Sequence, residues 1–316
     1  MTGITQVFAP LGARVRLFAL VVGMSFVAAP GVFAQDGVTD KVAPEIENRS
    51  DALDVPFVPS TTAVLDAMFE FTKPTRGDYV IDLGSGDGRI VIYAAKQFGA
   101  RGHGMDLNEG LVAVANNRAK RAGVGDRARF YVRDLFKEDV SGASLVTMYL
   151  LPEVVLQLRP KLFRELKPGT RIASHDYHMG NWRFDAAKVV DGATRGEESI
   201  VYYWKVPARV AGTWKWTVSY PAYFEGAREY TGLVRQQYQD IEGRVEHDLQ
   251  PMRIHDAKMD GAKIAFSITG EMDERIVRHD YAGTVDGNRI TGTVTMSGGV
   301  QPSSFPWQAR RTQADN

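Results

Sequence analysis

The chain has 316 residues, 44% of them hydrophobic and 24% charged, which is typical of a globular protein rather than a disordered or fibrous one. Its 38 basic and 38 acidic residues balance, so no bulk charge attracts nucleic acid or an anionic membrane. The lack of cysteine excludes disulfides and thiol nucleophiles, and the length favours two domains.

Residues 1–34 have the pattern of a secretory signal peptide. Arg14 and Arg16 precede an uncharged, mostly apolar run from Leu17 to Ala29, and a Pro-Gly pair then leads to a cleavage site that ends at Ala34. We expect a periplasmic or secreted mature protein without a stable membrane span. An uncleaved anchor is the alternative, although a span needs ~20 apolar residues. Residues 35–54 are polar and aperiodic and are predicted to be a linker.

From about residue 55 to 206, apolar runs of the β type alternate with helical patterns. This alternation predicts an α/β domain with parallel strands and crossover helices. The predicted strands are Tyr79–Asp82, Gly102–Asp106, Arg129–Val132, Leu145–Leu150 and Arg171–His175, and the predicted helices are Thr62–Thr72, Arg89–Phe98, Gly110–Ala122 and Glu153–Leu166.

After Pro207 the pattern changes. Ile264, Phe266 and Ile268 alternate with polar residues, and turns such as Asp260-Gly261 recur. A period of two with hairpin turns predicts a smaller antiparallel all-β domain over residues 208–312, a barrel or a sandwich of about seven or eight strands. An aromatic cluster that includes Trp214 and Trp216 opens this domain and is interpreted as core, with a binding platform as the alternative.

A glycine loop follows the first predicted strand. Gly84, Gly86 and Gly88 come directly after Asp82 and lead into a helix, and Asp87 lies inside the loop. Glycines allow close approach of a ligand to the backbone, and a helix N-terminus favours anions. Two acids would repel a pyrophosphate, so the loop suits a ligand with an ammonium and a sulfonium, such as S-adenosyl-L-methionine. An ordinary strand-to-helix turn is the alternative.

Two further acids follow later strands. Asp106 ends the second strand, where a carboxylate can accept hydrogen bonds from both ribose hydroxyls. Asp134 follows the third strand and could accept from the adenine amino group, with the backbone N–H of Leu135 meeting the ring. The alternatives are a helix N-cap at Asp106 and a solvated turn acid at Asp134.

These residues resemble class I S-adenosylmethionine-dependent methyltransferases. A narrower similarity over residues 55–182 is to the protein-lysine methyltransferases of the ATP synthase c-ring and the adenine nucleotide translocase. It is carried by Val55–Ser60, Tyr149–Pro152, Leu158–Lys161 and Ser174–Trp182. The resemblance implies a Rossmann-like seven-stranded sheet, with strands at Ala187–Val190 and Ile200–Val206, the last one antiparallel. It also implies that Pro56–Thr61 covers the cofactor, with Phe57 where the family often has tyrosine.

The resemblance further implies methyl transfer to a lysine of a protein substrate. Tyr149–Pro152, at the carboxyl end of the fourth strand, form the candidate acceptor slot, with a buried strand end as the alternative. His175 and Asp176 follow the fifth strand, and one of them could take the acceptor proton. They could also be structural, or ligate a metal with His178. We expect no metal and no nucleic-acid partner.

Two other functions stay open. The first is a non-catalytic, exported nucleoside-binding scaffold whose β domain is the working part. The second is binding of a small apolar ligand inside the β domain, which a cavity there would support. Export also requires that the charged cofactor be carried across a membrane.

Overall fold

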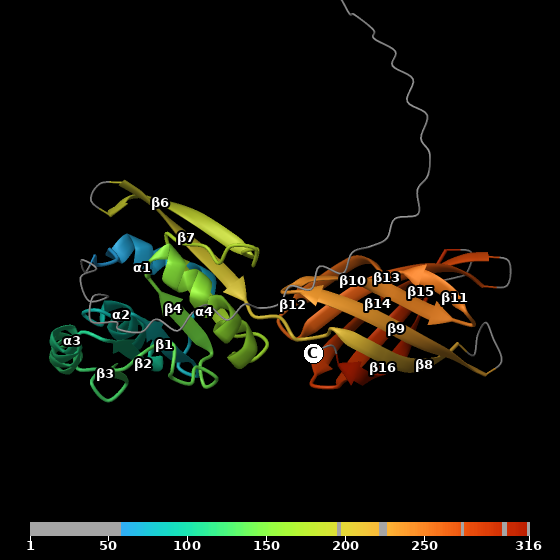
Figure 1. Cartoon of the computed structure of the whole chain (residues 1–316), viewed down its shortest axis with the longest axis horizontal. Coiled ribbons are helices and arrows are strands. Elements are labelled where there is room, and N and C mark those ends of the chain that lie inside the picture. Colours follow the sequence, from blue (N-terminus) through green and yellow to red (C-terminus); the bar gives the residue numbers. More distant parts are fainter. Residues whose placement is uncertain (1–57, 195–196, 221–225, 273–274, 299–301, 315–316) are drawn as a thin grey trace, which may run out of the picture. The chain divides into compact units, whose positions relative to one another are not determined.

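The computed structural model describes residues 58–194, 197–220, 226–272, 275–298 and 302–314. The predicted signal peptide, the predicted linker and Phe57 lie outside these residues. The described residues form two sheets within a single compact unit of the chain. Sheet A ends at Lys205, and sheet B begins at Gly212 (Figure 1).

Sheet A has seven strands in the order β3-β2-β1-β4-β5-β7-β6. β1 to β5 run parallel to one another, whereas β7 is antiparallel to both β5 and β6. The α/β prediction and the antiparallel β7 agree with this order. The strands are β1 (Tyr79–Leu83), β2 (Arg101–Asp106), β3 (Ala128–Val132), β4 (Leu145–Met148), β5 (Arg171–His175), β6 (Ala186–Thr194) and β7 (Glu197–Lys205).

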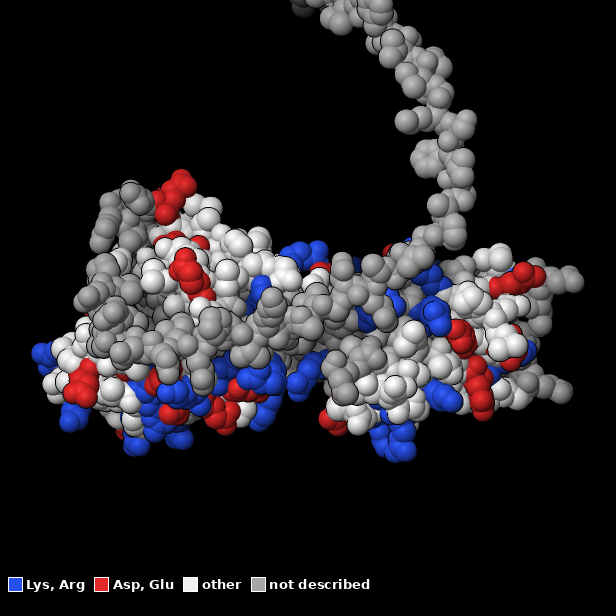
Figure 2. Space-filling model, viewed as in Figure 1, with Lys and Arg blue, Asp and Glu red and all other residues white. Residues whose placement is uncertain are grey.

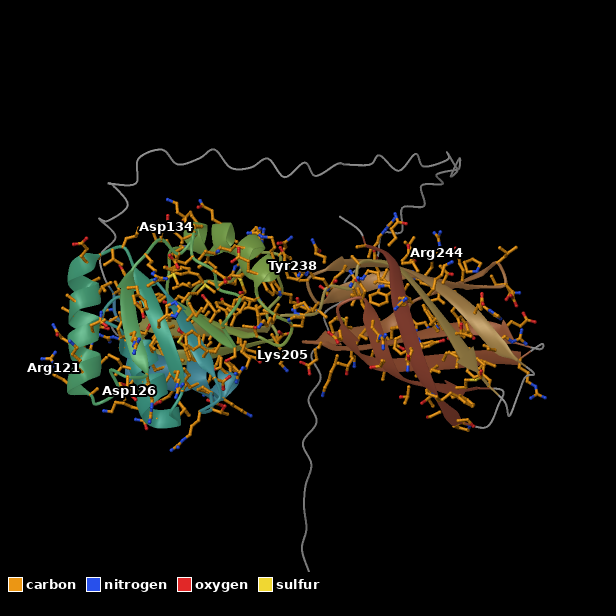
Figure 3. All side chains as sticks on the ribbon, turned by 90° about the horizontal axis from the view of Figure 1, so that it is seen from below. Arg121, Asp126, Asp134, Lys205, Tyr238 and Arg244 are labelled. Atoms are coloured by element: carbon orange, nitrogen blue, oxygen red, sulfur yellow. The ribbon has the colours of Figure 1, made fainter. Side chains whose placement is uncertain are left out.

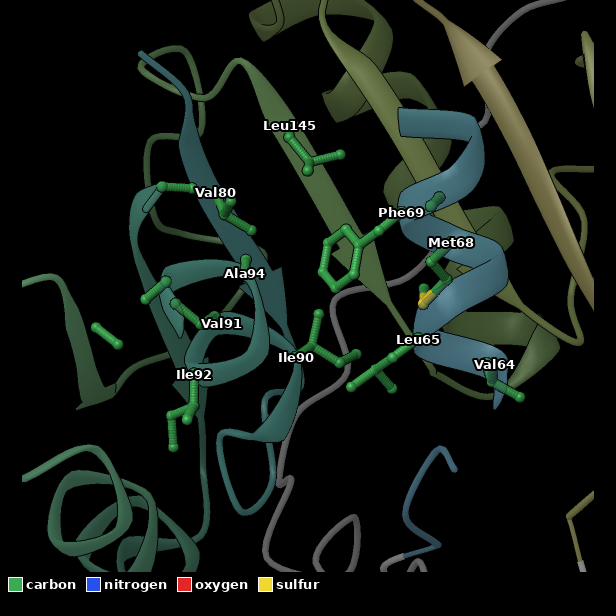
Figure 4. Packing of buried hydrophobic residues seen from close by; sticks show 14 of the residues in the cluster. Val64, Leu65, Met68, Phe69, Val80, Ile90, Val91, Ile92, Ala94 and Leu145 are labelled. Carbon is green, nitrogen blue, oxygen red and sulfur yellow. The ribbon is translucent and has the colours of Figure 1, made fainter. Parts of the chain in front are cut away.

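Helices cover both faces of sheet A. The apolar sides of α1 (Thr62–Thr72), α2 (Arg89–Phe98) and α3 (Glu109–Arg121) pack with Val80 and Leu145 on one face. Figure 4 shows Leu65 and Phe69 of α1 directed toward Ile90 of α2 in this cluster. On the other face, α4 (Pro152–Glu165) packs Val155, Leu158 and Leu162 against strand residues such as Ile81 and Met148.

Sheet B is a single antiparallel sheet in the order β11-β10-β9-β8-β16-β15-β14-β13-β12. Its two edge strands, β11 and β12, are joined through the single residue Ile254, and β12 approaches β10. It is therefore one curled sheet and not a sandwich. The strands are β8 (Gly212–Ser219), β9 (Ala227–Gln237), β10 (Asp240–His247), β11 (Gln250–Arg253), β12 (His255–Asp260), β13 (Lys263–Met272), β14 (Arg275–Asp286), β15 (Arg289–Ser297) and β16 (Ser303–Ala314).

Sheet B has nine strands, so the predicted number of seven or eight is wrong. The turn between β10 and β11 explains the difference, because Asp248 and Leu249 adopt positive φ values of 47° and 65° without the glycine that signals such a turn. β16 also extends to Ala314, two residues beyond the predicted end of the domain.

Large rings fill the interior of sheet B. Trp214, Trp307 and Tyr281 are at most 2% exposed and pack with Phe266 and Trp216. The apolar cavity among them has a volume of about 20 Å³, which is room for about one water molecule. The aromatic cluster is core, as predicted, and the interior does not support binding of an apolar ligand.

Charges of both signs are interspersed on the face of the molecule shown in Figure 2, in keeping with equal numbers of acidic and basic residues. Within the described residues, no helix is both long enough and apolar enough to span a bilayer.

Candidate active site

The carboxyl ends of four parallel strands meet at one edge of sheet A. β1 lies between β2 and β4, and β4 pairs with β5. Asp82, Asp106, Tyr149 and His175 lie at or just after these ends. Ligands of open α/β sheets bind at such an edge, so the fold brings the predicted cofactor and acceptor residues to one place.

The glycine loop takes a conformation that only glycine adopts readily. Gly84, Gly86 and Gly88 have φ values of 74°, 50° and 79°. A Cβ atom on Gly84 would lie 2.5 Å from Leu150 Cδ2, and one on Gly88 would lie 2.6 Å from the Phe130 ring. The loop is also tied to β2, because the N–H of Gly84 donates to the Met105 carbonyl at 2.9 Å. The loop therefore packs directly on the strands, with no room for a side chain at Gly84 or Gly88.

Asp106 links β2 to this loop. Its Oδ2 accepts from the N–H of Gly86 at 2.8 Å, and its Oδ1 accepts from the N–H of Asn108 at 2.9 Å. The N-cap of α3 is Asn108, whose side chain accepts from the N–H of Leu111. The N-cap alternative for Asp106 is therefore wrong, and its fixed carboxylate keeps further lone pairs for ligand hydroxyls.

Asp82 is buried at the base of the site. Its Oδ1 accepts from the Thr147 hydroxyl at 2.7 Å, and its Oδ2 has no hydrogen-bond partner among the described residues. Burial raises the pKa of Asp82 to about 7 against the lowering effect of the Thr147 hydrogen bond, with smaller contributions from the charges of Asp106 and Asp87. A bound cation would compensate this desolvated carboxylate.

Asp87 has a different role from the one predicted. Its carboxylate binds the guanidinium of Arg89 at 2.6 Å and also that of Arg118. Burial opposes ionisation, but the Arg89 hydrogen bond and both positive charges keep the pKa of Asp87 below its usual value. Because two arginines already neutralise this carboxylate, it fastens the glycine loop to α2 and α3 rather than facing a cationic ligand.

Asp134 and Leu135 follow β3 near the same edge. Asp134 Oδ1 accepts from the N–H of Phe136 at 2.9 Å, and Lys137 Nζ lies 3.6 Å from its Oδ2. Leu135 is half-buried against the cluster that contains Met105 and Met148. The geometry shows a turn-forming acid, and a contact of Asp134 or Leu135 with adenine stays a prediction.

The candidate acceptor residues pack around a buried histidine. The Tyr149 ring lies over the His175 ring with centroids 3.8 Å apart. His175 is fully buried, and its Nδ1 is 2.9 Å from the Ser60 hydroxyl. Burial lowers the pKa of His175 to about 4, although the charge of Asp176 opposes this. His175 is therefore a neutral imidazole at neutral pH.

Asp176 is held by the strand beside it. It adopts a positive φ of 61°, and its Oδ1 accepts from the N–H of Ile200 at 2.9 Å. Its Oδ2 lies 3.4 Å from His175 Nε2, and that nitrogen has no hydrogen-bond partner among the described residues. His178 accepts from the N–H of Gly180. Within the described part of the chain, no group of three or more His, Asp or Glu residues is arranged to hold a metal ion.

Sequence reasoning missed two residues that complete the site. Ser60 binds His175 through its hydroxyl, and its carbonyl accepts from Arg89 at 2.8 Å. Thr147 holds Asp82 in place. Ser60 lies in a segment that the sequence singled out, but only the tertiary structure shows its partners, 29 and 115 residues away.

The residues at this edge fit S-adenosyl-L-methionine. Asp82 Oδ2, Ser85 Oγ, Thr61 Oγ1 and His175 Nε2 are buried polar atoms that lack a hydrogen-bond partner within the described ranges. Buried polar atoms are normally paired, so these atoms are available to a polar ligand at this edge. Fixed carboxylates at Asp82 and Asp106 suit its ammonium and hydroxyl groups.

Comparison with known proteins agrees with this geometry. A family model described as the ANTKMT methyltransferase domain matches residues 82–186. A protein-lysine N-methyltransferase of Saccharolobus islandicus is 41% identical over 140 residues, which make up 44% of this chain and 87% of that protein. A human ATP synthase lysine N-methyltransferase is 40% identical over 131 residues, 42% of this chain and 55% of the human protein.

Among solved structures, an RNA methyltransferase from Salinibacter ruber in complex with S-adenosyl-L-homocysteine is 46% identical, with a TM-score of 0.45; the match covers 48% of this chain and 96% of that one. The family match ends at residue 186, before sheet B begins. The identity to a relative that the chain covers almost completely shows common ancestry. The chain belongs to the ANTKMT methyltransferase family and is an S-adenosyl-L-methionine-dependent methyltransferase.

Proposed function

We propose that this protein is an exported enzyme that N-methylates a lysine side chain of a protein substrate, on a Rossmann-like domain. The observation that carries this proposal is the packing of Tyr149 on the buried His175 beside the cofactor carboxylates. The family relatives that are protein-lysine N-methyltransferases, at about 40% identity, support the choice of acceptor.

The cofactor supplies a methyl group already activated on a sulfonium. A neutral amine displaces the sulfur in line, so the N–C bond forms as the C–S bond breaks. The chain must therefore hold donor and acceptor in line, and such alignment contributes ~7–11 kcal/mol. Asp82 and Asp106 hold the donor, and the exposed side of the Tyr149 ring borders the acceptor path.

The acceptor lysine must lose a proton before transfer, because an ammonium has no free electron pair. A free lysine has a pKa of ~10.4, which apolar surroundings lower. Tyr149 and the half-buried Leu150 supply such surroundings. The lysine proton passes to water at the rim of the site, where Leu151 is 41% exposed.

His175 does not act as the base in this proposal. Its pKa of about 4 makes proton transfer from a free ammonium of pKa ~10.4 unfavourable by about 9 kcal/mol. Instead it is a positioning residue that supports the Tyr149 ring and binds Ser60. Asp176 is a positioning residue too, since its carboxylate is bound to the backbone of β7.

Radiolabelling tests the proposed reaction. The chain from Gln35 onward is incubated with S-adenosyl-[methyl-³H]methionine and envelope proteins of the native host, and labelled proteins are digested and sequenced by mass spectrometry. We expect methyl groups on lysine Nζ, and none with Asp106→Ala at the same cofactor concentration. Label in RNA, or in no protein, would contradict the proposed acceptor.

Export is tested separately by N-terminal sequencing of protein from the native host. We expect Gln35 as the first residue, because the basic residues, the apolar run and the small-residue site occur in the order of a signal peptide. Finding Met1 or Thr2 on cytoplasmic protein would overturn export without affecting the methyltransferase assignment.

A further inference from the structure

We propose that Tyr238 of sheet B positions the acceptor loop, which we define as residues 176–185 between β5 and β6. Tyr238 lies in the two-residue turn between β9 and β10 (Figure 3). This inference rests on the proposed function, because the acceptor loop begins directly after His175. It assigns the second sheet a role in methyl transfer that the family match does not cover.

Tyr238 packs among aromatic rings of sheet A. Its ring stacks on Trp182 of the acceptor loop, with centroids 4.9 Å apart and planes 4° from parallel. Phe163 of α4 meets the edge of both rings, with centroids 5.2 Å from Tyr238 and 5.6 Å from Trp182. Trp182 is fully buried, so the ring from sheet B completes its enclosure.

The neighbouring residue of the turn binds the loop backbone. Gln239 is 8% exposed, and its side-chain amide donates to the carbonyl of Arg183. The Arg183 side chain also pairs with Asp240 at 2.7 Å, but both groups are exposed and such pairs contribute little. The buried contacts of Tyr238 and Gln239 therefore dominate this attachment.

The same turn reaches the loop through α4. Arg159 donates to the Met179 carbonyl at 3.0 Å and to the Asn181 side chain. Its guanidinium carbon lies 5.9 Å from the centre of the Tyr238 ring, within range of a cation–π contact. Tyr238 thus contacts both Trp182 and the arginine that fixes the middle of the loop.

The turn itself is held in an uncommon conformation. Tyr238 has a φ of 54°, a region that residues with a Cβ rarely occupy. Gln236 donates to the Tyr238 carbonyl at 2.6 Å and accepts from the N–H of Val210 at 2.6 Å. The hydrogen bonds of Gln236 stabilise the turn in this conformation. Strained backbone conformations of this kind are commonly found at functional sites.

Hydrogen–deuterium exchange of the full chain tests this proposal. In Tyr238→Ala, we expect exchange of the backbone amides of residues 176–185 to rise about three- to tenfold, the expected effect of losing an aromatic pair. Affinity for S-adenosyl-L-homocysteine by calorimetry should stay within about twofold, because Asp82 and Asp106 are untouched. The apparent KM for labelled envelope proteins should rise more than kcat falls, and Tyr238→Phe should restore both values.

Two further variants keep the test decisive. Asp260→Ala breaks the ion pair with the Lys205 side chain, a contact between the sheets, and keeps the hydrogen bond from the Lys205 backbone N–H to Asp185 of the acceptor loop, so exchange in 176–185 should stay unchanged. Gln239→Met removes the hydrogen bonds from the Gln239 side chain to Arg183 and Asp185 of the acceptor loop, and it replaces Tyr238→Ala in the test if that variant does not fold. Unchanged exchange in folded Tyr238→Ala, or equal effects of Asp260→Ala, would overturn the proposal. If the wild type transfers no methyl group to protein, the proposed function fails, and the exchange measurement still decides this inference.

Discussion

The two sheets of this protein use their interiors in opposite ways. At the carboxyl edge of sheet A, carboxylates, hydroxyls and an imidazole are buried, and several of their polar atoms lack a partner within the described residues. Inside sheet B, large aromatic rings fill the space; the hydroxyls of Tyr220 and Tyr230 lie 3.2 Å apart, and the indole nitrogen of Trp307 lacks a partner within the described residues. Carboxylates and an imidazole are costly to bury, whereas rings are not, so the difference in lining separates a region suited to binding a polar ligand from one that stabilises the fold.

The largest expected effect comes from the interior of sheet B. Trp307→Ala should lower the free energy of unfolding by about 3–5 kcal/mol, because a buried ring that touches Tyr281 and Phe266 leaves a cavity. Denaturant titration measures the loss. Calorimetry below the unfolding transition should show unchanged affinity for S-adenosyl-L-homocysteine, and a matching loss of affinity would contradict the division of roles.

Asp106→Ala should weaken cofactor binding and leave the stability of the fold nearly unchanged, the reverse of Trp307→Ala. If Asp106 binds the ribose hydroxyls as predicted, the variant loses two charged hydrogen bonds to the ligand, worth ~1.5–3 kcal/mol each, so the affinity for the cofactor should fall at least about tenfold. Asp106 is only half-buried, and the folded state should persist. Circular dichroism and calorimetry check both parts, and unchanged affinity in a folded variant would remove the ribose assignment.

Asp82→Asn should raise stability while it weakens binding. The wild-type carboxyl has a pKa of about 7 when folded and 3.8 as a model group, so folding becomes less favourable as pH rises from about 4 to 7. The variant should therefore have a larger free energy of unfolding than the wild type at pH 8. At pH 4 this difference should disappear. Thermal unfolding of ligand-free protein at both pH values tests this, and an advantage independent of pH would contradict it. Wild-type affinity for the cationic cofactor should increase through pH 7, and that of the variant should not.

His175→Gln should give the smallest change. The pKa of His175 is about 4 in the folded protein and 6.5 as a model group, so the unfolded chain binds a proton that the folded chain does not as pH falls from about 6.5 to 4. Wild-type stability therefore declines over this range, and the variant should decline less. Denaturant titrations at pH 7.5 and 4.5 measure the difference, and equal declines would show that another group is responsible.

Local patterns in the sequence were sufficient to predict the glycine loop and the place of two carboxylates at the strand ends. The positive φ values of Gly84, Gly86 and Gly88, and the carboxylates at the ends of β1 and β2, follow from chain-local rules about turns and strand ends. These residues act through their own backbone or through adjacent strands. Their positions were therefore predictable without any knowledge of distant contacts.

The partners of buried groups were not predictable in the same way. Asp87 binds Arg118 of α3, 31 residues away, and Ser60 binds His175, 115 residues away. The turn at Asp248 and Leu249 was missed because it has no glycine. Each of these outcomes depends on which elements pack together, and a one-dimensional pattern carries no information about that choice.

The sequence by itself therefore determined the order of strands and helices, the cofactor class and the change from a helical to a two-residue period after Pro207. The tertiary structure decided that one Asp82 oxygen has no hydrogen-bond partner among the described residues. It also decided that the interior of sheet B is filled and that the turn at Tyr238 contacts the acceptor loop. The physical reason is the sequence separation over which each effect acts. Backbone preferences act over a few residues, whereas burial and pairing join residues from distant parts of the chain.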